Sequence, residues 1–214
     1  MSQPALMTHS EKTLVKIFKN RGLSPIKIPE SEFNNEKRPD FEVLIGELIT
    51  IWEVKEITEN PSEKEIELGN LPDQTYSVES SKRIEKHIDK ARKQFISYSA
   101  NDKPCIIAIM DKRGFFTKDL LLPDEIMLTL AGRGHFMEGS SGQLLEIHRD
   151  KSRISEYGFI SAIAILYQEK EEIVFIHNPH AKFPLNTSDF SLIFKKNYRP
   201  RLTDKGLQWE SDHT

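Results

Sequence analysis

Residues 39–55 read PDFEVLIGELITIWEVK. Phe41, Val43 and Ile45 place an apolar side chain at every second position, and residues 48–57 are rich in β-branched and aromatic side chains, as strands are. Gly46 and Glu47 separate the two runs, and glycine in the first position of a two-residue turn is typical of type II′ hairpins. These residues therefore predict a β-hairpin.

The hairpin would gather charged side chains at its open end. If Gly46 and Glu47 form the turn, the residue numbers of each directly opposed pair add up to 93. Asp40 then faces Glu53, and Lys55 projects from the same face as Glu53. Like charges placed opposite each other destabilise a sheet, so the pair indicates a bound hard divalent cation, which prefers carboxylate oxygens. A lysine salt bridge on an exposed hairpin is the simpler alternative.

The motif formed by Pro39-Asp40, twelve intervening residues and Glu53-Val54-Lys55 resembles that of the PD-(D/E)xK nuclease superfamily. The signature of that superfamily is Pro-Asp followed by Glu-x-Lys across a hairpin. The resemblance covers residues 11–110. It implies the restriction-endonuclease-like α/β fold, in which helices flank a mixed central sheet.

The resemblance also implies an activity, namely hydrolysis of phosphodiester bonds with Mg²⁺ or Mn²⁺. We expect DNA as the substrate, an endonuclease, and products with 5′-phosphate and 3′-hydroxyl ends. Asp40, Glu53 and the backbone carbonyl of Val54 would bind the metal, and Lys55 would orient the attacking water or stabilise charge on the phosphorus. The alternative from another class is a nucleic-acid-binding or assembly module that keeps this fold without catalysis.

A helix is predicted over residues 11–21, because Leu14, Val15 and Phe18 recur at helical spacing and Gly22 can end it. Glu11 lies on the inward-facing stripe of this helix. The superfamily often keeps an extra acidic residue near the metal there, so Glu11 is a further candidate ligand. Alternatively, Glu11 merely occupies the first turn, where a negative charge is favourable.

A longer helix is predicted over residues 78–99, with a polar stripe beside its apolar one. Residues 79–98 carry a net charge of +3, which suits contact with nucleic-acid phosphates. Gln94 and Tyr98 also resemble a Gln-x-x-x-Tyr motif of the recombination-nuclease branch. The candidate nucleic-acid-binding residues are Arg83, His87, Lys90, Gln94 and Tyr98. The alternative is a solvated helix face, with Tyr98 in the core and Gln94 at the surface.

Beyond the second helix, apolar runs predict strands at 105–110, 159–167 and 173–177, whereas residues 111–153 have no sustained period. We expect one domain over residues 1–214, with a catalytic core at about 8–110 and a remainder of unassigned role that completes it. His177 and His180 could suggest zinc, but a turn is the more common meaning of such a pair. A basic cluster at 195–201 could touch nucleic acid, although a solvated tail is the more common meaning.

The overall composition excludes a global attraction to polyanions, because the net charge of the 214 residues is −3. One cysteine, Cys105, allows no internal disulfide and no cysteine-rich zinc site, which suits a reducing compartment. The chain shows neither a signal peptide nor a run long enough to cross a bilayer. We therefore expect a cytoplasmic protein that binds DNA and no membrane, and a homodimer is one assembly that the sequence leaves open.

Overall fold

The computed structural model describes residues 7–30, 37–59, 61, 81–100, 102–113, 122–140, 142, 144–150, 154–178, 180–185, 190, 194 and 196–213. The helices in these ranges are α1 (His9–Asn20), α3 (Lys82–Ser97), α5 (Leu122–Ala131) and the short 3-10 helix η1 (Ile154–Tyr157). The strands are β1 (Ile26–Lys27), β2 (Phe41–Ile45), β3 (Leu48–Ile57), β4 (Cys105–Asp111), β5 (Gly134–Glu138), β6 (Leu144–Arg149), β7 (Ile160–Tyr167), β8 (Glu172–His177), β9 (Lys196–Thr203) and β10 (Gly206–His213). None of the described helices is long and apolar enough to cross a membrane.

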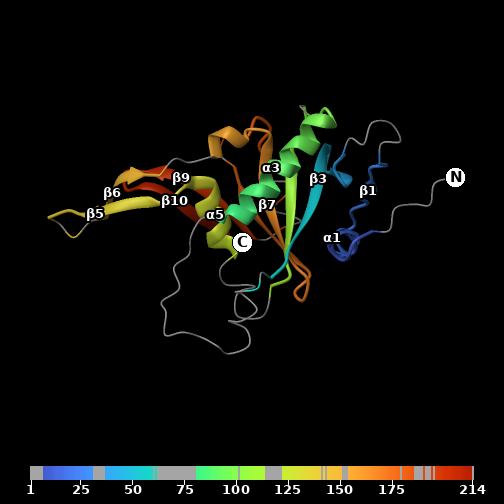
Figure 1. Ribbon diagram of the computed structural model, residues 1–214, viewed down its shortest axis with the longest axis horizontal. Helices are drawn as coiled ribbons and strands as arrows, with labels where there is room; N and C mark the ends of the chain where they lie inside the picture. Colours follow the sequence, from blue (N-terminus) through green and yellow to red (C-terminus); the bar gives the residue numbers. More distant parts are fainter. Residues whose placement is uncertain are drawn as a thin grey trace.

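A mixed sheet of eight strands forms the centre of the molecule, in the order β1-β2-β3-β4-β7-β8-β9-β10 (Figure 1). Strand β3 pairs with β2 in antiparallel and with β4 in parallel orientation, and β4 also pairs in parallel with β7. A parallel pair needs a crossover, and α3 lies in the connection from β3 to β4. The predicted α/β class with helices around a mixed sheet is confirmed at this level.

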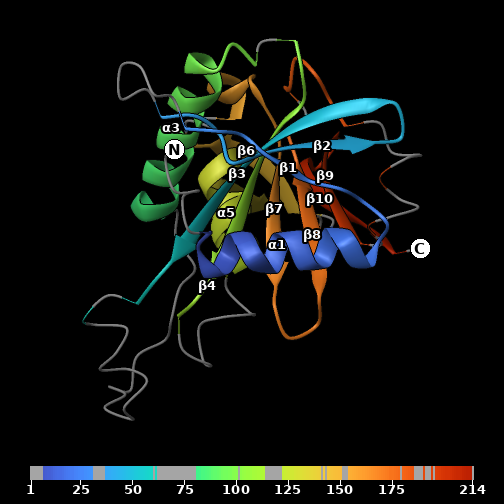
Figure 2. The same cartoon turned by 90° about the vertical axis from the view of Figure 1, so that its right-hand side faces the viewer.

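The central strands of the sheet are buried on both faces, because helices lie against both of them (Figure 2). Strand β4 demonstrates this most clearly, since all seven of its residues are buried. Cys105, Ile107 and Ile109 pack in the core beneath α3 and α5, whereas Ile106 and Ala108 pack in the core beneath α1. The prediction that the apolar run at 105–110 forms a strand buried on both faces is therefore confirmed.

The predicted β2–β3 hairpin is present with the expected register. Five pairs have residue numbers that add up to 93, from Ile45 opposite Leu48 to Phe41 opposite Trp52. Gly46 has a φ of +63°, as the first position of a type II′ turn requires. The paired residues end at Phe41, so Asp40 lies one residue beyond the ladder, and its N–H donates to the Trp52 carbonyl.

The first helix begins with a capping box, in which the Thr8 side chain accepts from the Glu11 N–H and the Glu11 side chain accepts from the Thr8 N–H. It ends where Gly22 adopts a φ of +74°, and the Gly22 and Leu23 amides then bond back to the last turn. The second predicted helix is observed as α3, and residues 78–80 of that prediction lie outside the described residues.

The second half of the chain contains elements that the sequence pattern did not reveal. Between residues 111 and 153 the structure has α5 and the β5–β6 ribbon, and Figure 1 shows this ribbon beside β9 and β10 at one side of the molecule. Tyr198, Arg199 and Arg201 lie in β9, which pairs with β8 and β10. The interpretation of this region as a solvated tail was therefore wrong. Lys195 lies outside the described part of the chain.

Candidate active site

The Glu-x-Lys residues lie in the second half of β3, where α3 crosses the sheet. Glu53 is buried, with 2% of its surface exposed, and one of its oxygens, Oε1, forms an ion pair with Lys55. The Lys55 ammonium also donates to Gln94 Oε1 at 3.0 Å, and Gln94 Nε2 in turn donates to the Arg38 carbonyl at 3.0 Å. Residues from β3 and α3 therefore hold one another in a fixed polar chain.

The carboxylate of Glu53 is only half satisfied. Its second oxygen, Oε2, is buried and has no hydrogen-bond partner among the residues that the structure describes. Burial raises the pKa of Glu53 to about 7, the negative charge of Asp40 raises it as well, and Lys55 and Gln94 oppose the shift. A buried carboxylate oxygen without a partner is costly, so this atom is placed for a ligand such as a cation or a proton.

Asp40 lies beyond the first residue of β2, between β1 and β3. Its Oδ2 accepts a hydrogen bond from the Val54 N–H at 2.7 Å, and its Oδ1 lies 3.1 Å from the Lys27 ammonium. The pKa of Asp40 is raised, first by burial and also by the nearby Glu11, while the Val54 N–H acts in the opposite direction. Asp40 and Glu53 therefore influence each other through their charges without forming a registered strand pair.

Glu11 joins the site from the first turn of α1, as the resemblance implied. Its Oε1 pairs with Lys27, and its Oε2 accepts from the Thr8 N–H at 2.6 Å. Burial works against ionisation of Glu11, yet hydrogen bonds with Lys27 and Asp40 lower its pKa overall. Glu11 therefore occupies the favourable first turn of the helix and also lies beside Asp40, and its role as a metal ligand stays a prediction.

Lys27 is the site residue that sequence reasoning missed. It belongs to the two-residue strand β1, where it lies opposite Phe41, and its ammonium binds Glu11 and Asp40 together. Prolines at 25 and 29 indicated only an extended chain here. The available signal was the alternation of Ile26, Lys27 and Ile28, since Ile28 is buried and a strand turns the residue before it toward the other face.

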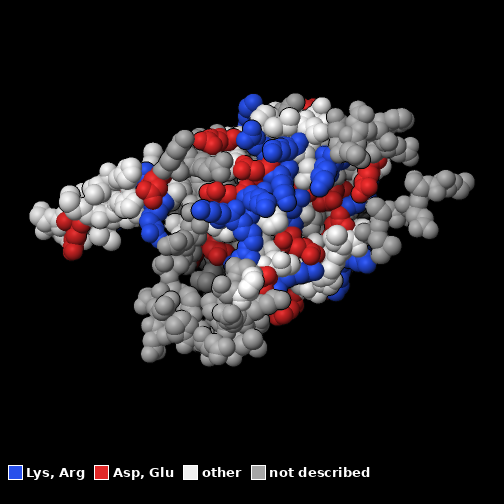
Figure 3. Space-filling view, viewed as in Figure 1, with Lys and Arg blue, Asp and Glu red and all other residues white. Residues whose placement is uncertain are grey.

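The polar stripe of α3 mostly faces the site. A pocket of about 520 Å³ lies between α3 and β3, and it is lined by Lys37, Glu53, Lys55, His87, Lys90, Lys93, Gln94 and Ser97. In Figure 3 the Lys and Arg side chains gather near the middle of this face, where Figure 1 places α3. The pocket combines a half-satisfied carboxylate with several ammonium groups, which suits a bound anion such as a phosphate.

Three members of the predicted nucleic-acid stripe, His87, Lys90 and Gln94, line this pocket. Burial lowers the pKa of His87, and the positive charges of Lys55 and Lys90 lower it further. Its buried Nδ1 has no hydrogen-bond partner within the described ranges.

Two of the predicted nucleic-acid residues have other contacts. Arg83 donates to the Thr58 carbonyl, and the Tyr98 hydroxyl donates to Glu42 at 3.2 Å. Neither lines the pocket that contains Glu53. Tyr98 is partly buried and packs against the core, as the solvated-face alternative expected, but Gln94 is buried and not at the surface.

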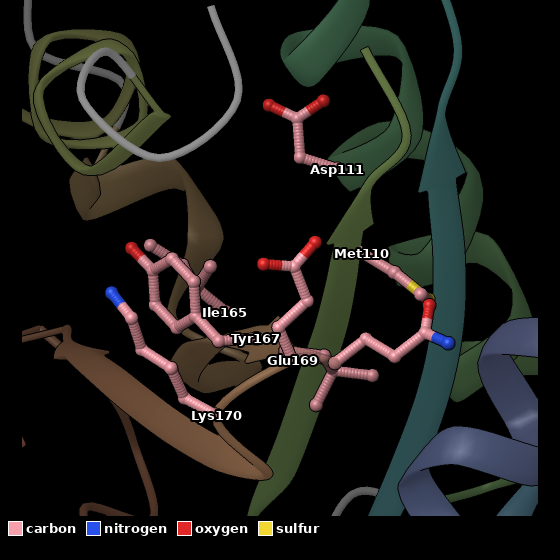
Figure 4. A pocket seen from close by; sticks show the side chains of 8 residues that line it. Met110, Asp111, Ile165, Tyr167, Glu169 and Lys170 are labelled. Carbon is pink, nitrogen blue, oxygen red and sulfur yellow. The ribbon is translucent and has the colours of Figure 1, made fainter. Parts of the chain in front are cut away.

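Two other places are less suited to chemistry. The small pocket of Figure 4, about 20 Å³, has room for about one water, and the Asp111 carboxylate beside it is bound by Arg113 at 2.6 Å. His177 lies 2.9 Å from Asn197, and the Asn178 side chain holds the following turn by accepting from the His180 N–H. The turn interpretation of this histidine pair therefore agrees with the structure.

The carboxylates of Glu11, Asp40 and Glu53 are not arranged as the ligands of one metal ion. Across the described ranges, no group of three or more His, Cys, Asp or Glu side chains is arranged to hold a metal ion. Ammonium groups instead occupy the neighbourhood of the carboxylates, with Lys27 beside Asp40 and Lys55 beside Glu53.

Comparisons of the chain with protein-family models, curated proteins and solved structures found no match.

Proposed function

We propose that this protein is a Mg²⁺- or Mn²⁺-dependent nuclease with a restriction-endonuclease-like fold and that DNA is its substrate. The observation that carries the proposal is the buried Oε2 of Glu53, which has no partner in the described chain although Asp40 and Lys55 lie beside it. The Pro-Asp and Glu-x-Lys residues meet at the end of the β2–β3 hairpin, as in the superfamily that the motif resembles.

Carboxylate oxygens are the ligands that a hard divalent ion prefers; Glu53 Oε2 has no partner among the described residues, and Asp40 Oδ1 lies against the Lys27 ammonium. Asp40, Glu53 and the Val54 carbonyl would hold the metal, with Glu11 nearby. The N–H and C=O of a strand residue point toward the same neighbouring strand, so the Val54 carbonyl shares the Asp40 side of β3. A metal bound there would polarise the scissile phosphate and lower the pKa of a bound water.

The remaining steps belong to the side chains of this chain. Lys55, held by Glu53 and Gln94, would stabilise charge on the phosphate, and Lys90 and Lys93 would bind phosphates next to the scissile one. The positive charge is local, which reconciles nucleic-acid binding with a net charge of −3. A cytoplasmic location stays part of this proposal, and self-association stays a prediction.

The test is cleavage of supercoiled, linear, single-stranded and branched DNA, and of RNA, in Mg²⁺ and in Mn²⁺. We expect Glu53→Gln and Lys55→Met to lower the cleavage rate by roughly 10² to 10³-fold. Glu47→Gln is the matched control, because Glu47 is an exposed acid in the turn of the same hairpin, and it should cleave normally. Equal rates for wild type and both site variants would refute the assignment.

The ammonium of Lys27 between Glu11 and Asp40 gives a specific reason to keep a second candidate. A nucleic-acid-binding module without catalysis would have such a permanently neutralised site. Salt-dependent DNA binding without cleavage in either metal would favour this candidate.

A further inference from the structure

The Lys27 ammonium lies where two acids of the candidate site converge. It forms ion pairs with Glu11 Oε1 and with Asp40 Oδ1, the second at 3.1 Å. The Glu11 side chain is buried and that of Asp40 is mostly buried, so neither carboxylate is well solvated. Two poorly hydrated negative charges that lie close together need a counter-cation, and Lys27 supplies it.

The backbone fixes Lys27 in this place. Lys27 is paired with Phe41 across β1 and β2, and the next residue, Ile28, donates its N–H to the Asp40 carbonyl at 2.9 Å. The ammonium also lies 4.8 Å from the centre of the Phe41 ring, where a cation is attracted to the aromatic face. The position therefore results from strand register and not from a chance surface rotamer.

The same contacts leave Asp40 little capacity for a metal. Its Oδ2 is held by the Val54 N–H, and its Oδ1 is held by Lys27. With all groups ionised, Glu11, Asp40 and Glu53 carry one more charge than Lys27 and Lys55 neutralise. A divalent ion placed beside an ammonium a few ångströms away would meet strong repulsion in this partly buried site.

Lys27 has a route out of the site. Strand β1 is an edge strand of two residues, and 34% of the Lys27 side chain is exposed. The exposed part of this side chain gives the ammonium a path into solvent.

We infer that the Lys27 ammonium is a resident counter-cation that a divalent metal must displace from Asp40, so that Lys27 sets the metal affinity of the site. This inference rests on the metal site of the proposed function. The role of Lys27 is opposite to that of Lys55. Lys27 holds the acids in place when no metal is bound, and it competes with the metal for them.

The experiment is a titration of the protein with Mn²⁺ alone, followed through the electron paramagnetic resonance signal of free Mn²⁺. Lys27→Met removes the charge and keeps the length of the side chain. We expect it to bind Mn²⁺ about tenfold more tightly than wild type, a change equivalent to about 1.4 kcal/mol. Lys27→Arg, which keeps the charge, should bind as weakly as wild type.

Lys103→Met is the matched control. The Lys103 side chain is 32% exposed and pairs with Glu42, a glutamate on β2, at 3.3 Å, so its removal deletes a similar ion pair outside the site. It should leave the Mn²⁺ affinity unchanged. Lys27→Gln, which retains hydrogen-bonding groups, replaces Lys27→Met if circular dichroism finds the latter unfolded.

The outcomes separate this inference from the proposed function. If Lys27→Met binds Mn²⁺ as wild type does, or more weakly, while Asp40→Asn abolishes binding, the displacement is refuted and the metal site stands. If wild type and every variant fail to bind Mn²⁺, both the displacement and the metal-dependent activity are refuted.

Discussion

The Asp40 carboxylate accepts a hydrogen bond from the backbone N–H of Val54 at 2.7 Å, just beyond the last registered pair of the β2–β3 hairpin. A side chain thus takes the place of the next backbone acceptor in the ladder. Because Val54 lies between Glu53 and Lys55, this bond ties the Pro-Asp part of the motif directly to its Glu-x-Lys part.

The bond makes Asp40 a structural residue as well as a candidate ligand. Asp40→Ala leaves the N–H of the buried Val54 without this acceptor, so we expect a loss of about 1–3 kcal/mol in the free energy of unfolding. Asp40→Asn keeps an acceptor and removes one negative charge next to Glu53, so it should be clearly more stable than Asp40→Ala. Urea denaturation with a chelator present measures both. Equal losses in the two variants would contradict the role given to this bond.

The pKa of Glu53 leads to a pH dependence of stability. Its pKa is about 7 in the folded protein, compared with 4.5 for an unperturbed glutamate, so the folded state holds the proton more tightly. The protonated Glu53 therefore stabilises the folded state fully below pH 4.5, and this stabilisation is lost as the pH rises to about 7. The loss in the free energy of unfolding from this residue is about 3 kcal/mol.

The measurement is the difference between wild type and Glu53→Gln in metal-free urea denaturation at a series of pH values. Since glutamine does not titrate, the variant should lack the fall in stability between pH 4.5 and about 7. Glu47→Gln should follow wild type. A difference that does not change with pH would show that Glu53 titrates normally.

Gln94 is expected to act by positioning Lys55. Gln94→Met removes both the acceptor for Lys55 and the donor to the Arg38 carbonyl while keeping a side chain of similar length. We expect a loss of about 1–3 kcal/mol in stability, because polar partners are left in a mostly buried place. The cleavage rate should fall while the affinity for DNA changes little, since Gln94 itself carries no charge. A large loss of DNA affinity with an unchanged cleavage rate would instead make Gln94 a substrate contact.

The lysines that line the large pocket should determine the salt dependence of DNA binding. Lys90→Glu and Lys93→Glu should each weaken binding and reduce the slope of log affinity against log salt concentration by about one. Fluorescence anisotropy with a labelled duplex measures the slope. Lys82→Glu is the control, because Lys82 is exposed on the same helix but does not line the pocket. If Lys90→Glu and Lys93→Glu have the same slope as Lys82→Glu, this face of α3 is solvated and does not bind phosphates.

The thiol of Cys105 should be unreactive in the native protein. Burial raises its pKa to about 12, and the residue is fully buried at the start of β4. Ellman's reagent should therefore label the protein only after a denaturant is added. Rapid labelling under native conditions would contradict the packing described for β4.

The hairpin and its register could be predicted because they depend on local signals, the alternation from Phe41 to Ile45 and the glycine of the turn. The contact of Asp40 with Lys27 could not, since it depends on β1. That strand has only two residues, and its pairing with β2 joins segments that are separated in sequence. The predicted Asp40–Glu53 opposition thus became an interaction between charges and not a registered pair.

The elements missed in the second half lacked a pattern for a physical reason. Strands β5 and β6 pair only with each other, and most of their residues are exposed, among them Phe136 and Ile147. A ribbon without a buried face has no cause to alternate between apolar and polar residues. Strand β9 has a similarly mixed pattern of exposure. Its sequence therefore shows no strand alternation, and its basic residues led to the prediction of a solvated tail.

The Gly46–Glu47 turn lies at the end of the hairpin opposite to the candidate site, about 20 Å from Glu53 at roughly 3.3 Å of rise per strand residue. Glu47 is exposed, and the native chain has a single, buried thiol. Glu47→Cys would accordingly provide one accessible attachment point in an otherwise natural sequence. A dye or a surface tether fixed there would leave the lysine-lined pocket facing solution, so that individual DNA encounters could be watched on immobilised protein.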